Sequence, residues 1–477
     1  MMLGVAFRSG AFALGAFVAA CGPSSPATTG GGGEGGETTA STGGGVGLGG
    51  MGDPVPDDAQ WQALKGLRYV AEPPPDVTNQ WADDADAALL GQAFFFDAGF
   101  SGPLIDGDND GSVHALGVKG ETGRVACAGC HVPADGFVDT RSLGQQISLA
   151  AGWVLRRTPS LLDVGHRKLL NWDGRRDSTW SQALGVIEAS REMNSSRLYL
   201  AHQIHARYRD AYEAIFGTLP PLDDNARFPS LTADQAGCAE LDASPDACHG
   251  RPGDGAEYDG MTPADRDAVT RVAVNVGKAL GAYLRRLRCG ESRFDRWLDG
   301  DEAALTAAEK RGALHFVDTG CIDCHGGPLL SDSSFHNVGL MPALVAVVFI
   351  DEDDPGASAG VDALLDDPLR CTGPYSDGDD GRLPTSVDPA WLGAFRTPSL
   401  RCSAPRPSFM HTGQLRSLDE VVAFFERGGH PAGYLGTSEL TDLQLDDQAV
   451  ADLVAFLGAL DGPGPEPALL VAPPGYP

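Results

Sequence analysis

The feature that most constrains this chain is the pattern Cys-x-x-Cys-His, which occurs at residues 127–131 (CAGCH) and again at residues 321–325 (CIDCH). In this pattern both thiols can bond to the vinyl groups of a haem, and the histidine is placed to ligate its iron. A redox-active Cys-x-x-Cys needs no histidine, and a zinc site needs a second cysteine pair much closer than the 194 residues that separate these pairs. The sequence therefore predicts two covalently bound c-type haems. The residues predicted to bind them are Cys127, Cys130, His131, Cys321, Cys324 and His325.

Outside these motifs and Cys21, five cysteines remain. Cys238 and Cys248 lie close together in a polar loop, which favours a disulfide in an oxidising compartment. Cys371 and Cys402 could form a second disulfide, and Cys289 would then be left over. Because five is an odd number, at least one thiol stays free.

The beginning of the chain predicts export. Residues 1–20 carry one charge, Arg8, followed by an apolar run over residues 11–20. That run is too short to span a bilayer and has the form of a secretory signal. Residues 18–21 (VAAC) resemble a bacterial lipobox, in which Cys21 would be lipidated and become the new N-terminus. Ordinary signal cleavage near the same place is the alternative. We expect a protein on the periplasmic side of the cell envelope, anchored by lipid through Cys21.

A glycine-rich tether is predicted over residues 21–55. Of residues 22–52, 14 of the 31 are glycine, and such a segment cannot bury enough apolar area to fold. The whole chain has 35 basic and 65 acidic residues, a net charge of −30. Nucleic acid is therefore not an expected partner, because phosphate binding needs a basic surface.

The expected fold is mainly α, with two tandem cytochrome c-type haem domains and long loops. Residues 263–287 and 446–460 have the apolar periodicity of amphipathic helices, and Thr262 before Pro263 is a helix-start signal. Each such helix closes a segment that carries one haem motif. We therefore predict an N-terminal haem domain over 56–298, a C-terminal haem domain over 299–464 and a tail over 465–477.

From about residue 85 to residue 462 the order and spacing of motifs resemble the bacterial di-haem cytochrome c peroxidase family, which includes MauG-like enzymes. The motifs of the first half are Leu90-Gly91, Phe95-Phe96-Asp97, the first haem motif, Thr158-Pro159-Ser160-Leu161, Trp172-Asp173-Gly174-Arg175, Gln182 and Glu192-Met193. Those of the second half are Phe294-Asp295, the second haem motif, Phe335-His336-Asn337, Thr397-Pro398-Ser399-Leu400-Arg401 and Met410-His411-Thr412-Gly413.

The resemblance implies a role for each matching residue. His131 would be the proximal ligand of the peroxide-reacting haem, and His325 would ligate the electron-supplying haem. Glu192, 20 residues after Trp172 as in the family, falls at the distal glutamate. A carboxylate there can take a proton from one peroxide oxygen and return it to the leaving oxygen. Gln182 would be a hydrogen-bonding residue of the same pocket, and Trp172 would lie between the haems.

Two departures concern the haem ligands. No histidine occurs between His131 and His166, so the removable distal histidine of many family peroxidases is missing and the first haem should be five-coordinate or water-bound. That resembles the MauG-like branch. At the second haem the family's distal Met or Tyr position is Phe425, which cannot ligate iron. Met410 is the first candidate ligand and His430 its rival, and a five-coordinate second haem is a third option.

A third departure concerns calcium. The family's inter-domain calcium site uses an asparagine directly before the Thr-Pro-Ser-Leu segment, and here that position is Arg157. We hypothesise that its guanidinium supplies the positive charge in place of calcium. Residues 106–111 (DGDNDG) look like the front of a calcium loop, but the twelfth position is Gly117 and not glutamate, so an acidic turn is at least as plausible.

Three functions follow from these expectations. The leading one is a di-haem peroxidase that reduces hydrogen peroxide to water with electrons from a small cytochrome or copper protein. The second is a MauG-like enzyme that uses peroxide to oxidise residues of a partner protein. The third is a non-catalytic di-haem electron carrier, in which Glu192 would have no role. Many relatives dimerise, so a homodimer is one expected state.

Overall fold

The computed structural model describes residues 53–477, except 142–146, 242–246, 343, 346–347 and 350–353. These described residues form one compact unit. The predicted signal at 1–20, Cys21 and the tether up to residue 52 lie outside the described residues. Among the residues that are described, no helix combines the length and the apolar character needed to cross a membrane.

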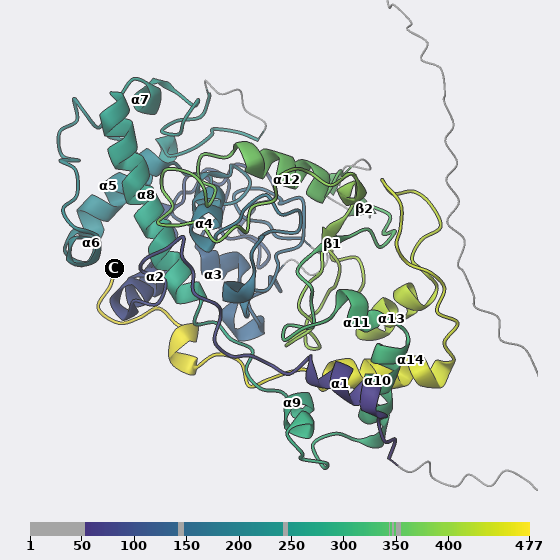
Figure 1. Ribbon diagram of the computed structural model, residues 1–477. Coiled ribbons are helices and arrows are strands. Elements are labelled where there is room, and N and C mark those ends of the chain that lie inside the picture. The colour runs from purple at the N-terminus through teal and green to yellow at the C-terminus, as the bar shows by residue number, and fades with distance from the viewer. Residues whose placement is uncertain (1–52, 142–146, 242–246, 343, 346–347, 350–353) are drawn as a thin grey trace, which may run out of the picture. The chain divides into compact units, whose positions relative to one another are not determined.

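Helices make up most of the regular structure (Figure 1). The α-helices are α1 (Asp58–Lys65), α2 (Ala85–Phe96), α3 (Cys127–Cys130), α4 (Thr179–Glu188), α5 (Arg197–Arg207), α6 (Arg209–Phe216), α7 (Ala256–Asp259), α8 (Pro263–Leu284), α9 (Arg293–Leu298), α10 (Ala307–Asp318), α11 (Cys321–Cys324), α12 (Ala357–Asp366), α13 (Leu418–Glu426) and α14 (Asp447–Gly458). Short 3₁₀ helices are η1 (Ala98–Phe100), η2 (Pro133–Asp135), η3 (Val164–His166), η4 (Ala233–Gln235), η6 (Pro389–Trp391) and η7 (Pro467–Leu470). The strands pair antiparallel, β1 (Phe335–His336) with β4 (Phe395–Arg396) and β2 (Leu344–Val345) with β3 (Val348–Phe349). The predicted mainly α class is confirmed.

Each haem motif lies beside a pair of crossing helices. α2 packs across α8 and contacts α3, and α10 packs across α14 and contacts α11. A Cβ on Gly91 of α2 would lie 1.9 Å from the carbonyl oxygen of Ala279 in α8. A Cβ on Gly312 of α10 would likewise lie 1.9 Å from the carbonyl oxygen of Asp452 in α14. Only glycine permits so close an approach, and the two halves of the chain use it at equivalent crossings.

Two large apolar clusters fill these halves. The first gathers side chains of α2, α4, α5 and α8, including the fully buried Trp180 and Tyr283. The second gathers side chains of α10 and α14, including Phe316 and Phe456, and also takes in Leu64 of α1. The exact domain boundaries stay a prediction.

The two predicted helices are present with small differences at their ends. α8 begins at Pro263, where the Thr262 side chain accepts a hydrogen bond from the amide of Asp265. It ends at Leu284, before the predicted Leu287, because the amides of Arg286 and Leu287 donate to the carbonyls three residues earlier, those of Tyr283 (2.9 Å) and Leu284 (3.1 Å), and not to the fourth as in an α-helix. The other predicted helix, 446–460, is α14. Its N-cap is Asp446, the first residue of the predicted range, and it ends at Gly458, two residues earlier than predicted.

The disulfides confirm one predicted pair and correct the other. Cys238 and Cys248 are bonded, as predicted. The second disulfide joins Cys289 to Cys402, so the suggested pairing of Cys371 with Cys402 was wrong. Cys371 is a buried free thiol whose backbone amide donates to the carboxylate of Asp177 (2.7 Å). Cys289 pairs with Cys402 because their segments meet in the folded chain. The spacing of cysteines along the sequence does not show which segments meet.

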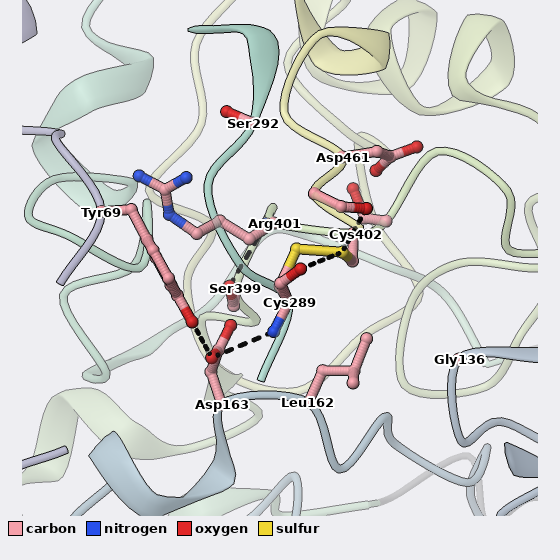
Figure 2. Close-up of a disulfide and its surroundings, with 12 residues drawn as sticks. Tyr69, Gly136, Leu162, Asp163, Cys289, Ser292, Ser399, Arg401, Cys402 and Asp461 are labelled. Carbon is pink, nitrogen blue, oxygen red and sulfur yellow. Dashed lines mark hydrogen bonds between the residues drawn. A yellow bond between two sulfur atoms is a disulfide. The ribbon is translucent and has the colours of Figure 1, made fainter. Parts of the chain in front are cut away.

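Figure 2 shows the Cys289–Cys402 disulfide where segments of the two halves meet. The carboxylate of Asp163 accepts a hydrogen bond from the amide of Cys289 (3.3 Å). Arg401, next to Cys402, forms a fully buried ion pair with Asp295 (2.8 Å). The disulfide and the Arg401–Asp295 ion pair tie the chain between the haem motifs to the chain that follows the second motif.

Candidate functional site

A cavity of about 770 Å³ lies beside the first haem motif, and this volume is within the range of ligand and cofactor sites. Residues that line it include Cys127, Cys130, His131, Trp172, Gln182 and Glu192. Apolar side chains form much of the remaining wall, among them Phe95, Leu170, Leu280 and Leu284. The structure therefore brings together all of the site residues that the sequence predicted in the first half.

The two motif histidines are held in the same way. The Nδ1 of His131 hydrogen-bonds to the carbonyl of Phe137 (3.1 Å), and the Nδ1 of His325 hydrogen-bonds to the carbonyl of Leu330 (2.8 Å). A proton on Nδ1 leaves Nε2 as the nitrogen able to ligate a metal. Burial lowers the pKa of His131 to about 4 and also lowers the pKa of His325. Both rings are therefore neutral, as a metal ligand must be.

A serine fixes the backbone that holds each histidine. The hydroxyl of Ser160 donates to the carbonyl of Gly136 (2.7 Å), and the hydroxyl of Ser399 donates to the carbonyl of Leu329 (2.8 Å). Each of these carbonyls directly precedes the residue that accepts from the motif histidine. The serine of each Thr-Pro-Ser-Leu segment thus makes the same hydrogen bond to the backbone beside its own haem motif.

The four motif cysteines are unpaired thiols. Burial raises the pKa of Cys127 and of Cys130 to about 12, and it raises the pKa of Cys321. Two protonated thiols, a neutral imidazole and an adjoining apolar cavity are the donor set and the space that a covalently bound haem needs. The residues present therefore fit such a group.

Glu192 reaches this cavity from the turn that follows α4. Its amide donates to the carbonyl of Ala189 (3.0 Å), and its carbonyl accepts from the amide of Ala151 (3.0 Å). The side chain is accessible from the cavity but otherwise enclosed by protein, and this burial raises its pKa, while Arg175 and Arg176 oppose that rise. A carboxyl group with a raised pKa can exchange a proton near neutral pH.

Gln182, on α4, belongs to a polar network that includes residues without a predicted role. Its side-chain amide lies 3.0 Å from that of Asn171. With the Asn171 oxygen turned toward Arg175, that oxygen lies 2.8 Å from Arg175 Nε. The sequence signals for Asn171 are its adjacency to Trp172 and its place 239 residues before Met410.

Trp172 lies where the two halves of the chain meet. Its ring nitrogen donates to the carbonyl of Arg157 (2.7 Å), and its ring centroid is 6.4 Å from that of His411 in the second half. The ring of His411 in turn stacks on Phe395 at 3.5 Å. The sequence predicted a position between haem sites for Trp172 but no role for His411.

An internal repeat in the sequence relates the residues that make these contacts. Residues 157–167 (RTPSLLDVGHR) and 396–406 (RTPSLRCSAPR) share the pattern Arg-Thr-Pro-Ser-Leu-x5-Arg, displaced by 239 residues. The same displacement relates Trp172 to His411 and Asn171 to Met410, and the latter two both have positive φ (63° and 68°). We call these segments, extended to residues 176 and 415, the RTPSL repeat.

The predicted ligands of the second haem lie in the second half. Met410 is partly buried in the second copy of the RTPSL repeat. His430 follows α13, and its Nδ1 accepts from the amide of Met341 (3.1 Å). Phe425, at the family's usual ligand position, is partly buried near the end of α13.

Neither the loop at 106–111 nor Arg157 has the arrangement of a cation site. In the loop at 106–111, Asp106 accepts from the amide of Asp108 (3.0 Å), and Asp108 accepts from the ring nitrogen of Trp153 (2.8 Å). Within the described part of the chain, no group of three or more histidine, cysteine, aspartate or glutamate residues is arranged to hold a metal ion. Arg157 is buried, and its Nε donates to the hydroxyl of Ser408 (2.8 Å).

The chain is similar in sequence and in fold to known di-haem proteins. The sequence profile of the family described as di-haem cytochrome c peroxidase matches residues 85–303. The methylamine utilization protein MauG of Methylorubrum extorquens is 28% identical over 421 residues, which cover 87% of this chain and 89% of that protein. The cytochrome-c peroxidase IdrP2 of Denitromonas iodatirespirans is 30% identical over 401 residues, covering 82% and 85%. The diheme peroxidase BthA from Burkholderia thailandensis has a similar fold, with a TM-score of 0.55 at 22% identity, over 79% of this chain and 86% of that one.

Proposed function

The chain belongs to the di-haem cytochrome c peroxidase family, an oxidoreductase family with two c-type haems, and from this premise we propose that it reduces hydrogen peroxide in the cavity beside His131. The observation that carries the proposal is a single cavity that His131, Trp172, Gln182 and Glu192 line together. The raised pKa of Glu192 supports its assignment as the group that moves the proton.

The residues divide the work as follows. Bound haem supplies the iron that exchanges electrons with peroxide, held by His131 in the first site and by His325 in the second. Glu192 accepts a proton from one peroxide oxygen and donates it to the other, so that water can leave. Gln182 orients the peroxide by hydrogen bonding. Trp172, in contact with His411, lies on the path between the halves. Each peroxide consumes two electrons and two protons and yields two waters.

Steady-state oxidation of a reduced donor tests this proposal. The holoprotein should oxidise a reduced small cytochrome or copper protein only when peroxide is added, at two donor molecules per peroxide. A basic donor suits the net charge of −30, and its rate should fall as salt is raised. Absence of peroxide-dependent oxidation with either kind of donor would count against the peroxidase.

A second function, oxidation of residues in a partner protein, has one observation in its favour. Among the described residues that line the cavity, His131 is the only imidazole, so peroxide would not have to await the release of a second histidine. The two functions differ in how long the oxidised protein persists after one equivalent of peroxide without a reductant. A long lifetime would favour the partner-protein substrate.

Met410 is proposed as the distal ligand of the second haem. Its counterpart in the RTPSL repeat, Asn171, lines the first cavity, which supports a similar position for Met410 at the second haem. Met410→Ala should convert a low-spin ferric haem to high spin in the EPR spectrum and lower its potential, because a thioether raises the potential of iron. His430→Ala should leave both unchanged. The opposite pattern would assign His430, and no change in either variant would indicate a five-coordinate haem.

Arg157 is proposed to replace calcium between the haem sites. Exhaustive treatment with EDTA should therefore leave peroxide turnover and the thermal midpoint of the holoprotein unchanged. The reason is that the buried guanidinium already supplies positive charge where the family places the ion. Loss of turnover that added calcium restores would refute this replacement.

Export and lipid attachment through Cys21 are also proposed, on the sequence of residues 18–21. In cells that make the full chain, Cys21→Ser should move the protein from the membrane fraction to the soluble extracytoplasmic fraction. A variant that stayed with the membrane would argue against the anchor.

A further inference from the structure

The RTPSL repeat places an arginine at both ends of each copy. These are Arg157, Arg167, Arg396 and Arg406. The two copies cross each other reciprocally in the folded chain. The amide of Arg157 donates to the carbonyl of His411 (2.7 Å), and the amide of Arg396 donates to the carbonyl of Trp172 (2.8 Å). Each copy is therefore anchored on the other, and this brings the arginines of both copies into one region.

The guanidinium groups are close enough to influence one another. Burial is the main cause of the lowered pKa of Arg406 and of Arg396; Arg157 and Arg167 lower that of Arg406 further, and Arg167 lowers that of Arg396 further. Three of the four, Arg157, Arg167 and Arg396, line the cavity beside the first haem motif. Like charges gathered in a protein interior repel one another, so this arrangement needs a compensating anion.

In the described part of the chain, no carboxylate lies close enough to pair with these guanidinium groups. Among the described residues none of the four arginines forms an ion pair; Asp163 and Asp461 are the acidic groups whose charge reaches Arg406, and Asp163 also reaches Arg167. Every hydrogen bond that the four guanidinium groups donate goes to a neutral oxygen. The acceptors are Ser408 Oγ for Arg157, the carbonyls of Ser160 and Leu162 for Arg167, those of Asn171 and Thr397 for Arg396, and that of Arg401 for Arg406.

Several of their nitrogens have no acceptor at all. Nη2 of Arg157, Nε of Arg167 and Nε of Arg406 are buried without a hydrogen-bond partner. Arg401 in the second copy shows the contrast, because its guanidinium is paired with the carboxylate of Asp295 (2.8 Å). Burial lowers the pKa of Arg157 and of Arg167 to about 10 and that of Arg406 to about 9. Unpaired buried donors of this kind point to a ligand that carries acceptors.

The missing anion can be identified by its chemistry. A haem carries two propionate carboxylates, so two haems carry four, and the repeat provides four guanidinium groups. Arginine pairs with carboxylate through two parallel hydrogen bonds. We propose that Arg157, Arg167, Arg396 and Arg406 form a four-arginine cluster that binds the haem propionates; Arg157, Arg167 and Arg396 line the first cavity. This rests on the two-haem content of the proposed function but not on peroxide turnover.

The cluster has a consequence for the haem potentials. Positive charge beside the haem opposes the ferric state and so raises the reduction potential. Propionates paired with arginine also stay ionised, because the guanidinium stabilises the charged form. The propionates should therefore add no pH dependence to either haem potential over the range in which free carboxylates titrate. The step that remains at the first haem is that of Glu192, which lines the same cavity and has a raised pKa.

Reduction potentials of the holoprotein test the cluster. They are measured for both haems by spectroelectrochemistry over a series of pH values in Arg157→Met, Arg167→Met, Arg396→Met and Arg406→Met. Each variant should lower the potential of at least one haem and make it more dependent on pH, because the released propionate then binds a proton. The matched Lys variants should lower the potential less. Arg197→Met is the control, since Arg197 is paired with Glu188 (2.7 Å) and does not line the cavity.

Potentials and pH slopes that match wild type in the Met variants, with two haems per chain, would overturn the cluster. A second measurement needs no variant. In the wild-type resonance Raman spectrum, the propionate bending bands should not shift as carboxylates titrate, and a shift would contradict pairing with arginine. Neither readout involves peroxide, so the cluster can fail while the peroxidase proposal stands, or the reverse.

Discussion

Glu192→Gln should reduce the rate of peroxide reduction by about 10²–10⁴-fold while both haems stay attached. The amide has nearly the same shape as the carboxyl group but cannot accept the proton from peroxide. Stopped-flow mixing of the holoprotein with peroxide measures the rate directly. Glu188→Gln is the matched control, because Glu188 is the last residue of α4, four residues before Glu192, pairs with Arg197 and does not line the cavity. Equal rates for Glu192→Gln and wild type would remove Glu192 from the mechanism.

The pH dependence of the same rate follows from the raised pKa of Glu192. The carboxyl group must be ionised to accept a proton, and burial favours its neutral form. The rate should therefore be full at high pH and fall as pH drops through the raised pKa, at a higher pH than an exposed glutamate would give. Glu192→Gln should lack this step.

Replacing both Cys289 and Cys402 with serine should lower the free energy of unfolding by roughly 4–5 kcal/mol, as expected for a disulfide that closes a loop of about 100 residues. The disulfide spans 113 residues and joins the two halves of the chain (Figure 2). Denaturant unfolding of the oxidised holoprotein measures this loss. Cys371→Ser is the control, and it should cost far less because Cys371 is a free thiol.

Peptide mapping without reduction gives an independent check of that pairing. Alkylation after unfolding should label Cys371 and leave Cys289 and Cys402 linked. Recovery of a peptide that links Cys371 to Cys402 would contradict the fold around this disulfide.

The sequence was sufficient where chemistry is tied to a local pattern. The haem motifs, the start of α8 at Pro263 and the mainly α class follow from residues that are close together in the chain. Glu192, Gln182 and Trp172 could be selected only through resemblance to a family, since nothing local distinguishes Glu192 from a surface carboxylate. The structure adds that all three line one cavity with His131.

The sequence was insufficient where the answer depends on which distant segments meet. Cys402 pairs with Cys289 and not with Cys371 because the second RTPSL copy crosses the chain that follows α8. His411 and Asn171 were missed as site residues because their contacts with Trp172 and Gln182 are tertiary. The RTPSL repeat is visible in the sequence. Only the structure shows that the guanidinium groups of its four terminal arginines are buried without a paired carboxylate.

The most direct test of the central claim is low-temperature EPR, with visible spectra, of the diferric holoprotein before and after one equivalent of hydrogen peroxide. We expect a high-spin ferric signal from the haem held by His131, and peroxide should remove it. That result would establish an open site that reacts with peroxide. Two low-spin haems that do not respond to peroxide, even after half-reduction, would contradict both enzymatic functions and leave a di-haem electron carrier.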